Sequence, residues 1–369
     1  MSRTLIVTND FPPRPGGIQA FVHELALRQE PDSLAVFASA HAGDDVFDAA
    51  QPFPIFRWPR YPMIPTPAVT ARAVELVRKL NIDTAWFGAM APLGAMAPKL
   101  RAAGVRRCVA QTHGHEVGWA ALPGARAALR RIGRSIDVVT YLGEYTRSRL
   151  DPVLGGVTTL ERLAPGVDIE RYHPGVSGAR VREKYGLGDR PVVVCVSRLV
   201  PRKGQDRLIS ALPLIRQKVP DAALLIVGGG RYERRLRALA RRLDVVFTGA
   251  VPWDELPEHY AAGDVFAMPC RTRRGGLDVE GLGIVYLEAS ALGLPVVAGD
   301  SGGAPDAVRE NETGFVVPGS DVDAIADKVC TLLTDRSLAL RMGAQGRAWV
   351  EQEWTWELIG ARMSKLLRG

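Results

Sequence analysis

Short apolar segments alternate with amphipathic segments twice along this chain, and this repeated alternation limits the possible folds more than any other feature. In the first half, runs rich in valine, leucine and aromatic residues predict buried, mostly parallel strands at Thr4–Thr8, Ser33–Ala38, Ala85–Gly88, Arg107–Thr112 and Val138–Leu142. Helical patterns lie between these runs, at Gln19–Gln29, Ala68–Leu80, Pro92–Ala103 and Arg126–Gly133. Such alternation predicts a doubly wound parallel sheet with helices on both faces.

The same pattern restarts after residue 190. Strands are expected at Pro191–Ser197, Ala222–Val227, Val245–Thr248, Asp264–Met268 and Pro295–Ala298. Helices are expected at Gln205–Lys218, Tyr232–Leu243, Ile284–Leu292 and Val322–Thr334. Between the halves, turn-forming residues without a strand make Pro165–Arg190 the expected link. We therefore expect an α/β chain of two Rossmann-like domains that face each other across a cleft, with ligands at the carboxyl ends of the strands.

Length and composition agree with two domains. The chain has 369 residues, which is longer than a single core usually supports. Hydrophobic residues make up 47% and charged residues 24%, which excludes a largely disordered or fibrous chain. The apolar runs are too short to cross a bilayer, and the N-terminus lacks the pattern of a signal peptide. We expect a soluble, cytoplasmic protein.

The cysteines and the net charge narrow the class of protein further. Cys108, Cys195, Cys270 and Cys330 lie far apart and form no CxxC pair, which excludes a zinc ribbon or a disulfide framework and predicts buried, reduced thiols. The formal net charge of +7 favours an anionic partner: nucleic acid, a nucleotide or an acidic membrane surface. The charge alone does not choose among these partners.

Two loops in the first half carry candidate binding residues. The loop after the first strand lacks the G-x-G-x-x-G of dinucleotide enzymes, which argues against an NAD or FAD enzyme. Its Gly16 and Gly17 would let a helix N-terminus approach a phosphate or sugar oxygen, although a plain tight turn explains them equally well. After a later strand, His113 and His115 do not suffice for a metal site. We expect His113 to contact substrate, whereas a structural role competes for His115.

A basic loop follows the first strand of the second half. Arg198 and Lys203 lie in this loop, at the expected edge of the sheet. A guanidinium and an ammonium group together match the charge of a diphosphate, although a solvated basic turn is the alternative.

The most informative segment is residues 271–289, where an Arg- and Gly-rich loop leads into a predicted helix. Glu280 ends the loop and Glu288 lies on the second turn of the helix. Free amides at Gly283, Ile284 and Val285 would suit an anion. The two carboxylates are also compatible with the acid and base of a glycosidase, but that enzyme needs no diphosphate site beside them. A carboxylate can also accept hydrogen bonds from sugar hydroxyls without transferring a proton.

Taken together, these motifs resemble the retaining GT-B glycosyltransferases of family 4. Glu280 and Glu288 match the E-x7-E signature of that family, and the other candidate residues fall where the family binds its donor. The resemblance extends over essentially the whole chain, including Trp354-Thr-Trp356 before a last helix that crosses back onto the first domain in this fold. It implies an acceptor domain of residues 1–169 completed by 353–369, and a nucleotide-sugar donor domain of residues 170–352.

Within the family, the sequence is most similar to phosphatidylinositol monomannoside α-1,6-mannosyltransferases of the PimB type, through residues 8–17, 112–119, 197–206 and 266–289. This similarity implies GDP-mannose as donor and the mannose 6-position of a phosphatidylinositol monomannoside as acceptor. It implies that Arg198 and Lys203 hold the diphosphate, that Glu288 binds the ribose and that Glu280 binds the mannose 3-hydroxyl. His113 would lie by the mannose 6-hydroxyl, and Gly16 and Gly17 would line the phosphate and acceptor side. Gly249–Val251 would lie near the guanine.

The family's chemistry is front-face substitution with retention, in which the leaving phosphate oxygen takes the acceptor proton. No side-chain nucleophile is then needed. The catalytic residues would be His113, Arg198, Lys203 and Glu280. Val251 and the helix amides of Gly283, Ile284 and Val285 would also bind the donor. With two cations and a helix terminus at the diphosphate, we expect no requirement for a metal or another cofactor.

Because the implied acceptor is a lipid, a membrane-binding surface is expected. Arg126, Arg130 and Arg134 recur at helical spacing, with Arg131 beside them, which suits either a helix on anionic lipid or a solvated basic face. The resemblance favours peripheral association with the inner face of the plasma membrane, and no nucleic-acid partner. Three alternatives remain: a family 4 enzyme with another donor and a soluble acceptor, a nucleotide-sugar epimerase, and a non-catalytic nucleotide-sugar binding protein.

Overall fold

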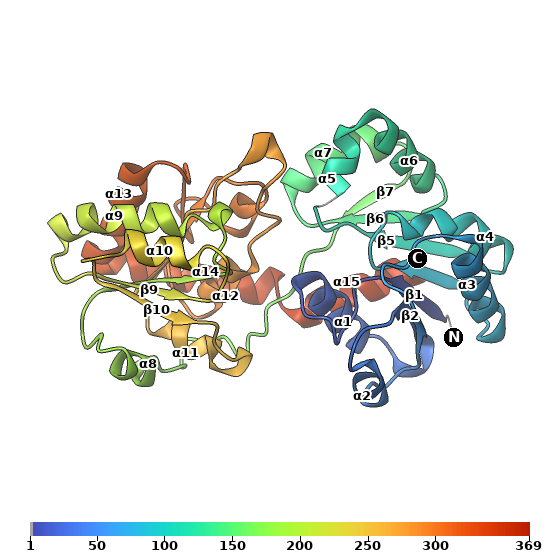
Figure 1. The fold of residues 1–369 in the computed structure, drawn as a ribbon, viewed down its shortest axis with the longest axis horizontal. Coiled ribbons are helices and arrows are strands. Elements are labelled where there is room, and N and C mark those ends of the chain that lie inside the picture. Colours follow the sequence, from blue (N-terminus) through green and yellow to red (C-terminus); the bar gives the residue numbers. More distant parts are fainter. Residues whose placement is uncertain (1–2, 115) are drawn as a thin grey trace. The chain divides into compact units, whose positions relative to one another are not determined.

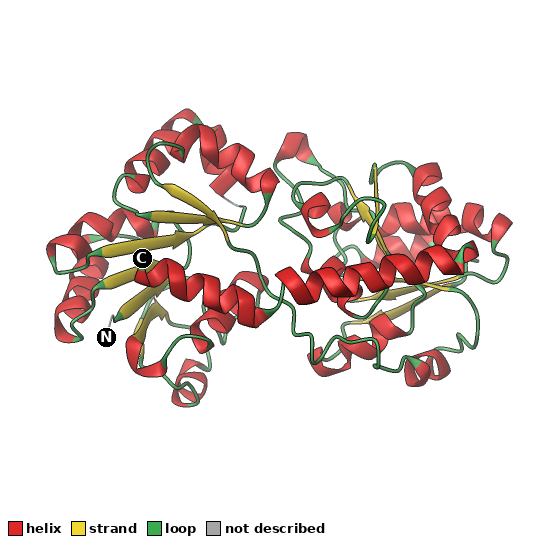
Figure 2. Cartoon of the chain, turned by 180° about the vertical axis from the view of Figure 1, so that it is seen from behind, coloured by secondary structure: helices red, strands yellow, loops and turns green. Residues whose placement is uncertain are grey.

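The computed structural model describes residues 3–114 and 116–369. The chain divides into two compact units, Met1–Gly166 with Trp356–Gly369, and Val167–Thr355, here called the N-terminal and C-terminal units. Each unit holds one sheet with helices packed around it (Figures 1 and 2). From the sequence, the boundaries were expected at 169/170 and 352/353.

The N-terminal unit is built on a seven-stranded sheet of order β3-β2-β1-β4-β5-β6-β7, in which all neighbouring strands are parallel. Its strands are β1 (Thr4–Thr8), β2 (Leu34–Ser39), β3 (Ile55–Trp58), β4 (Thr84–Phe87), β5 (Arg107–Gln111), β6 (Val138–Tyr141) and β7 (Thr159–Arg162). The central strands are buried along their length, as expected for parallel strands covered on both faces.

Eight helices of the described residues surround this sheet: α1 (Gly17–Leu27), α2 (Asp44–Ala49), α3 (Pro67–Lys79), α4 (Ala97–Ala102), α5 (Glu116–Ala121), α6 (Pro123–Gly133), α7 (Glu144–Leu154) and α15 (Trp356–Arg368). The last helix, α15, packs against α1, β4 and β5, so the end of the chain completes the first unit. Ile359, Met363 and Leu367 recur every four residues and form its buried stripe. The last helix expected from the sequence is therefore present and belongs to this unit.

The C-terminal unit is built on a six-stranded parallel sheet of order β10-β9-β8-β11-β12-β13. Its strands are β8 (Val192–Val196), β9 (Ala223–Val227), β10 (Val245–Gly249), β11 (Val265–Met268), β12 (Val296–Gly299) and β13 (Gly314–Val317). Its helices are α8 (Ala179–Lys184), α9 (Gln205–Lys218), α10 (Glu233–Leu239), α11 (Leu256–Ala261), α12 (Ile284–Ala291), α13 (Val322–Thr334) and α14 (Arg336–Glu353). Helices α9 and α13 pack on each other, and so do α12 and α14.

The strands expected from the sequence are present, with ends that differ by at most one residue. The sequence did not predict β3, β7 or β13, and it extended the helix that begins near Tyr232 too far, to Leu243. Helix α10 ends at Leu239, and Arg242 adopts a left-handed conformation with φ 67°, which a helix cannot continue through. All four cysteines are buried and free, as predicted.

Candidate functional site

The loops that follow β8 and β11 meet at the carboxyl edge of the C-terminal sheet. These two strands are neighbours in the sheet although β9 and β10 lie between them in the sequence, so the chain winds away from this point in both directions. Such a switch point leaves the adjacent loops splayed apart and is where open α/β sheets bind ligands. The sequence-predicted Lys203 follows β8, and the predicted Glu280 follows β11.

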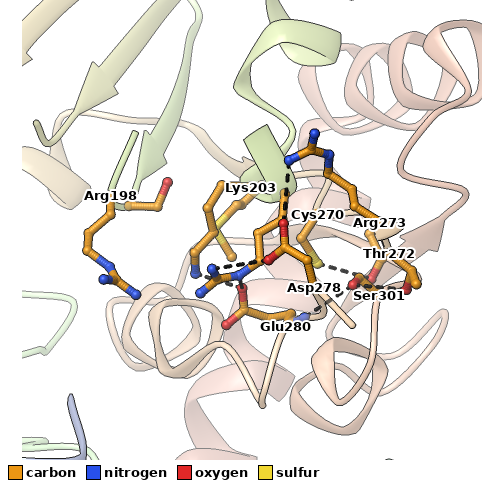
Figure 3. A network of polar contacts seen from close by, with 12 residues as sticks. Arg198, Lys203, Cys270, Thr272, Arg273, Asp278, Glu280 and Ser301 are labelled. Carbon is orange, nitrogen blue, oxygen red and sulfur yellow. Dashed lines mark hydrogen bonds and ion pairs between the residues drawn. The ribbon is translucent and has the colours of Figure 1, made fainter. Parts of the chain in front are cut away.

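Lys203 and Glu280 form an ion pair at this point, with Nζ and Oε2 2.7 Å apart (Figure 3). Both side chains are about nine-tenths buried. A buried ammonium group needs a compensating negative charge, and Glu280 supplies it in this structure. A cation and a carboxylate thus lie together at the switch point.

Arg198 lies apart from this pair. Its side chain is exposed, and no dashed line joins its guanidinium to any residue drawn in Figure 3. Within residues 3–114 and 116–369, that guanidinium makes no hydrogen bond or ion pair with another side chain. It is therefore available to an anionic ligand without first breaking a contact.

The loop that carries both cations is fixed by local contacts. Gln205 is fully buried, and its Nε2 donates to Ser197 Oγ at 2.8 Å and to the Arg198 carbonyl oxygen at 3.0 Å. Gly204 has φ 78°, and a Cβ there would lie 1.9 Å from the Pro269 carbonyl oxygen, so only glycine fits. These contacts hold the loop against the end of β11.

Glu280 is held by the loop after β12. Its backbone N–H donates to Ser301 Oγ at 3.2 Å, and its carbonyl oxygen accepts from the Gly303 N–H at 2.9 Å. Thr272 Oγ1 lies 3.2 Å from the same Ser301 hydroxyl, which links the Arg- and Gly-rich loop to this contact.

A second cation approaches Glu280. Arg202 Nε lies 3.7 Å from Glu280 Oε2, and Arg202 Nη1 lies 3.6 Å from Asp278 Oδ1. Asp278 also pairs with Arg273, at 3.4 Å. Glu280 therefore keeps a neighbouring positive charge even when Lys203 turns elsewhere.

Helix α12 begins directly beyond Glu280. Gly283 precedes it with φ 82°, and a Cβ there would collide with the Tyr286 ring at 2.4 Å. No side chain caps the helix, and its first turn holds no acidic residue. The amides of Gly283, Ile284 and Val285 are thus placed as predicted, at a helix start whose N–H groups have no intrahelical acceptors.

Glu288 lies one turn further along α12, and it is 7% exposed. Its Oε2 accepts a hydrogen bond of 2.5 Å from the Tyr260 hydroxyl. Burial raises the pKa of Glu288 from its ordinary 4.5 to about 7, although the Tyr260 hydrogen bond and Arg171 act in the opposite direction. The carboxyl is therefore poised between its neutral and ionised forms near neutral pH.

The region predicted to lie near the guanine follows β10. The Gly228 N–H donates to the Gly249 carbonyl oxygen at 2.9 Å, and the Leu199 N–H donates to the Gly229 carbonyl oxygen, also at 2.9 Å. Backbone contacts thus join the loops after β8, β9 and β10, and Val251 is half-buried beside them.

The N-terminal unit has its own switch point, between β1 and β4. Gly16 caps α1 and Gly17 begins it, again with no side-chain cap, and the space around Gly17 is open. His113, beyond β5, has its Nε2 2.6 Å from the Gly88 carbonyl oxygen at the end of β4, so Nε2 carries the proton. Gly16, Gly17 and His113, the candidate residues of this unit, therefore lie around the switch point between β1 and β4. His115 lies outside the described residues.

Sequence reasoning missed the residues that support the candidates. These are Asp10, Arg202, Gln205, Tyr260, Asp278 and Ser301. Of these, Asp10 lies by the glycine loop and accepts from Gln19 Nε2 at 2.7 Å. A carboxylate directly after the first strand was a signal that the sequence offered. The contacts of Tyr260 and Ser301 span 28 and 21 residues, and no local pattern reveals them.

Two further observations concern metals and membranes. In the described part of the chain, no three or more His, Cys, Asp or Glu side chains cluster as a metal site would require. None of the helices formed by these residues is both long and apolar enough to cross a membrane.

Family models match both units. Residues 15–171 match the model described as Glycosyltransferase Family 4, and residues 179–349 match the one described as Glycosyl transferases group 1. Together with the relatives below, these matches define the class of protein: the chain belongs to glycosyltransferase family 4, as its motifs indicated.

Relatives of the same length are similar from end to end. A GDP-mannose-dependent alpha-(1-6)-phosphatidylinositol monomannoside mannosyltransferase of Mycobacterium tuberculosis is 53% identical over 100% of this chain and 99% of its own. The protein of that name from Mycolicibacterium smegmatis is 55% identical over 99% and 98%. A GDP-mannose-dependent monoacylated alpha-(1-6)-phosphatidylinositol monomannoside mannosyltransferase of Corynebacterium glutamicum is 49% identical over 99% and 98%.

Solved structures share the fold. Anabaena HepE in complex with UDP has a TM-score of 0.84 at 20% identity, over 99% of both chains. Sucrose-phosphate synthase of Thermosynechococcus elongatus has a TM-score of 0.80 at 22% identity, over 99% of this chain and 98% of that one. The GT-B class expected from the sequence, with two Rossmann-like domains, is confirmed.

Proposed function

We propose that this chain transfers mannose, with retention of configuration, from GDP-mannose to the 6-position of mannose on a phosphatidylinositol monomannoside. The observation that carries this function is the similarity of 49–55% identity over nearly the whole length of relatives with that named activity. The enzyme thus acts in the synthesis of phosphatidylinositol mannosides.

The donor binds at the switch point of the C-terminal unit. Arg198 and Lys203 hold the diphosphate, together with the first amides of α12. Glu288 accepts hydrogen bonds from the ribose hydroxyls, and Glu280 accepts one from the mannose 3-hydroxyl. The exposed Arg198 and the buried Lys203–Glu280 pair support this assignment, because they place two cations and one carboxylate at the same loop junction.

Charge develops on the diphosphate as its bond to mannose breaks. Lys203 moves from Glu280 to the phosphate oxygen, and Arg202, already 3.7 Å from Glu280, continues to compensate that carboxylate. The departing phosphate oxygen takes the proton of the acceptor hydroxyl, so no side chain needs to act as a nucleophile. Preorganised donors of this kind each lower such a barrier by about 2–4 kcal/mol. The diphosphate is neutralised without a divalent metal.

The N-terminal unit binds the acceptor side. Gly16 and Gly17 allow backbone amides to approach the phosphate and the acceptor: the space beside Gly17 is open, whereas the Gln19 side chain lies beside Gly16. His113, protonated at Nε2 and held by the Gly88 carbonyl oxygen, lies by the mannose 6-hydroxyl. The His113 ring meets the Phe21 ring edge to face, with centroids 5.9 Å apart, and this contact fixes the plane of the imidazole.

Helix α6 forms a membrane-binding surface of the N-terminal unit. Arg126, Arg130, Arg131 and Arg134 are all exposed, and Leu122 before the helix is 64% exposed. Leu129 and Ile132 face the core, so the outer face of α6 is basic and Leu122 is its apolar part. This face binds the anionic inner surface of the plasma membrane, and no nucleic acid is a partner.

Incubation of the purified full-length chain with radiolabelled GDP-mannose and phosphatidylinositol monomannoside in mixed micelles tests the function. We expect a lipid dimannoside whose new bond is cleaved by an α-1,6-mannosidase, and little transfer from UDP- or ADP-sugars. Conversion of GDP-mannose without an acceptor would indicate an epimerase, and transfer only to a soluble glycan would indicate another acceptor. Binding without any conversion would indicate a non-catalytic protein.

A further inference from the structure

Arginine side chains crowd one surface of the C-terminal unit, on and beside α10. The segment 231–242 holds six arginines and a single acidic residue, Glu233. These arginines are all exposed: Arg231, Arg234, Arg235, Arg237, Arg241 and Arg242. We call them the α10 arginine face.

Most of this charge has no partner in the protein. Arg237 pairs with Glu233, with Nη2 and Oε1 2.8 Å apart, and its guanidinium lies over the Phe247 ring. Across the residues that the structure describes, the other five guanidiniums form no ion pair and no hydrogen bond. Several other arginines of this unit are compensated, for example Arg271, which binds both carboxylate oxygens of Asp206.

Side chains of this segment border a shallow hollow that is open to solvent. Arg234, Arg235, Arg237, Ala238 and Arg241 line a space of about 620 Å³. Arginines three and four residues apart on a helix repel each other, and α10 has only seven residues over which to offset that cost. A ligand with several negative charges would relieve this repulsion.

We propose that the α10 arginine face is a second membrane-binding surface, which takes the phosphate groups of anionic lipids from the donor-binding unit. The inference rests on the proposed function, because an enzyme with a lipid acceptor must work at a bilayer. Guanidinium groups bind phosphate oxygens in a bidentate manner, which suits lipid headgroups. Leu239, the last residue of α10, is 42% exposed and adds an apolar side chain that can enter the interface.

Nucleic acid fits this face less well than lipid does. Single strands are held by aromatic side chains that stack on bases, and the residues lining the hollow are four arginines and one alanine. Each unit thus has its own basic surface, α6 in one and α10 in the other, so either unit has its own affinity for the bilayer.

The double substitution Arg234→Gln with Arg241→Gln tests this surface. The matched control is Arg336→Gln with Arg341→Gln, two exposed arginines of α14 that carry the same charge. Sedimentation of the full-length proteins with vesicles of phosphatidylcholine and phosphatidylinositol gives a partition coefficient. Each arginine near an anionic surface contributes on the order of fivefold to binding, so we expect the α10 pair to lose about 25-fold and the control pair far less.

Three results would overturn the proposal. The first is an equal loss in both pairs, which would mean that net charge alone drives binding. The second is no loss in the α10 pair. The third is loss of duplex DNA binding by the α10 pair while its vesicle binding stays intact, which would make the face a nucleic-acid surface.

A parallel assay separates this proposal from the proposed function. With a water-soluble acceptor that carries the mannosyl inositol phosphate headgroup but no acyl chains, the α10 pair should transfer mannose at the wild-type rate. If the wild-type enzyme transfers no mannose to phosphatidylinositol monomannoside in mixed micelles, the proposed function fails, whatever the vesicles show. If transfer is normal and the α10 pair sediments like wild type, only the membrane surface fails.

Discussion

The Tyr260 hydroxyl donates a hydrogen bond of 2.5 Å to Oε2 of Glu288, and both side chains are buried. The Tyr260 ring stacks on Phe266, with centroids 5.6 Å apart, and meets Tyr172 edge to face at 5.9 Å. The phenol is thus fixed by packing, and it in turn fixes one oxygen of the carboxylate. The other oxygen keeps its capacity to accept hydrogen bonds from a ligand.

Tyr260→Phe should weaken GDP binding about tenfold, because hydrogen bonds to charged groups contribute about 1.5–3 kcal/mol and Glu288 would lose its orientation. Calorimetric titration of the full-length protein with GDP measures this change. Tyr286→Phe is the matched control, since that buried hydroxyl donates to the Met268 carbonyl oxygen at 2.7 Å. Equal losses in the two variants would show that buried tyrosines act only on the fold.

The raised pKa of Glu288 predicts a pH dependence of stability. The folded pKa of about 7 exceeds the ordinary value of 4.5, so between these values the folded state keeps a proton that the unfolded state has released. This contribution is fully present below about pH 4.5 and is lost as the pH rises through 7. Relative to Glu288→Gln, the wild-type free energy of unfolding should fall by up to about 3 kcal/mol over this interval. Urea unfolding at a series of pH values measures it, and two parallel pH profiles would contradict the prediction.

Lys203→Ala should lower turnover by roughly 100-fold or more, because it removes the cation that we propose faces the developing charge on the diphosphate. The fold should survive, since Arg202 remains near Glu280. Lys218→Ala, which removes a lysine that is 64% exposed, is the control for the loss of charge. Steady-state rates with GDP-mannose give the comparison. Near-normal turnover of the Lys203 variant would remove this residue from the mechanism.

The two glutamates should respond differently. Glu280→Gln is expected to reduce turnover while GDP still binds, because the proposed contact of Glu280 is with the mannose. Glu288→Ala should weaken GDP itself, because its proposed contact is with the ribose. Calorimetry with GDP and kinetics with GDP-mannose distinguish the two roles, and identical behaviour of the variants would refute the assignment.

The strands that the sequence failed to predict all lie at sheet edges. β3 and β7 flank the seven-stranded sheet, and β13 ends the six-stranded one. β3 and β7 are covered less completely and lack the continuous apolar run that marks a central parallel strand, whereas the four-residue β13 is mostly buried. In β7, three of the four residues are exposed. Its sequence is therefore that of a surface loop.

The candidate site was predictable where its residues follow strands in the sequence. Lys203 and Glu280 were found from the loops that carry them, and the sheet order then brings those loops together. Tyr260 was not found, because its position on the short helix α11 carries no local sign of a contact with Glu288, which lies 28 residues further on. Supporting contacts of this kind depend on tertiary packing alone.

Removal of divalent metals should leave turnover unchanged within about twofold. In the proposed donor site, two cations, Arg198 and Lys203, would approach a diphosphate of about two negative charges, and the uncapped start of α12 would add its partial positive charge. A divalent ion would then compete with these groups for the same oxygens. Dialysis of the enzyme against EDTA, followed by mannose transfer with and without added Mg²⁺ or Mn²⁺, measures the effect. A loss of transfer that either ion restores would show that the side chains and helix amides do not suffice to neutralise the leaving group.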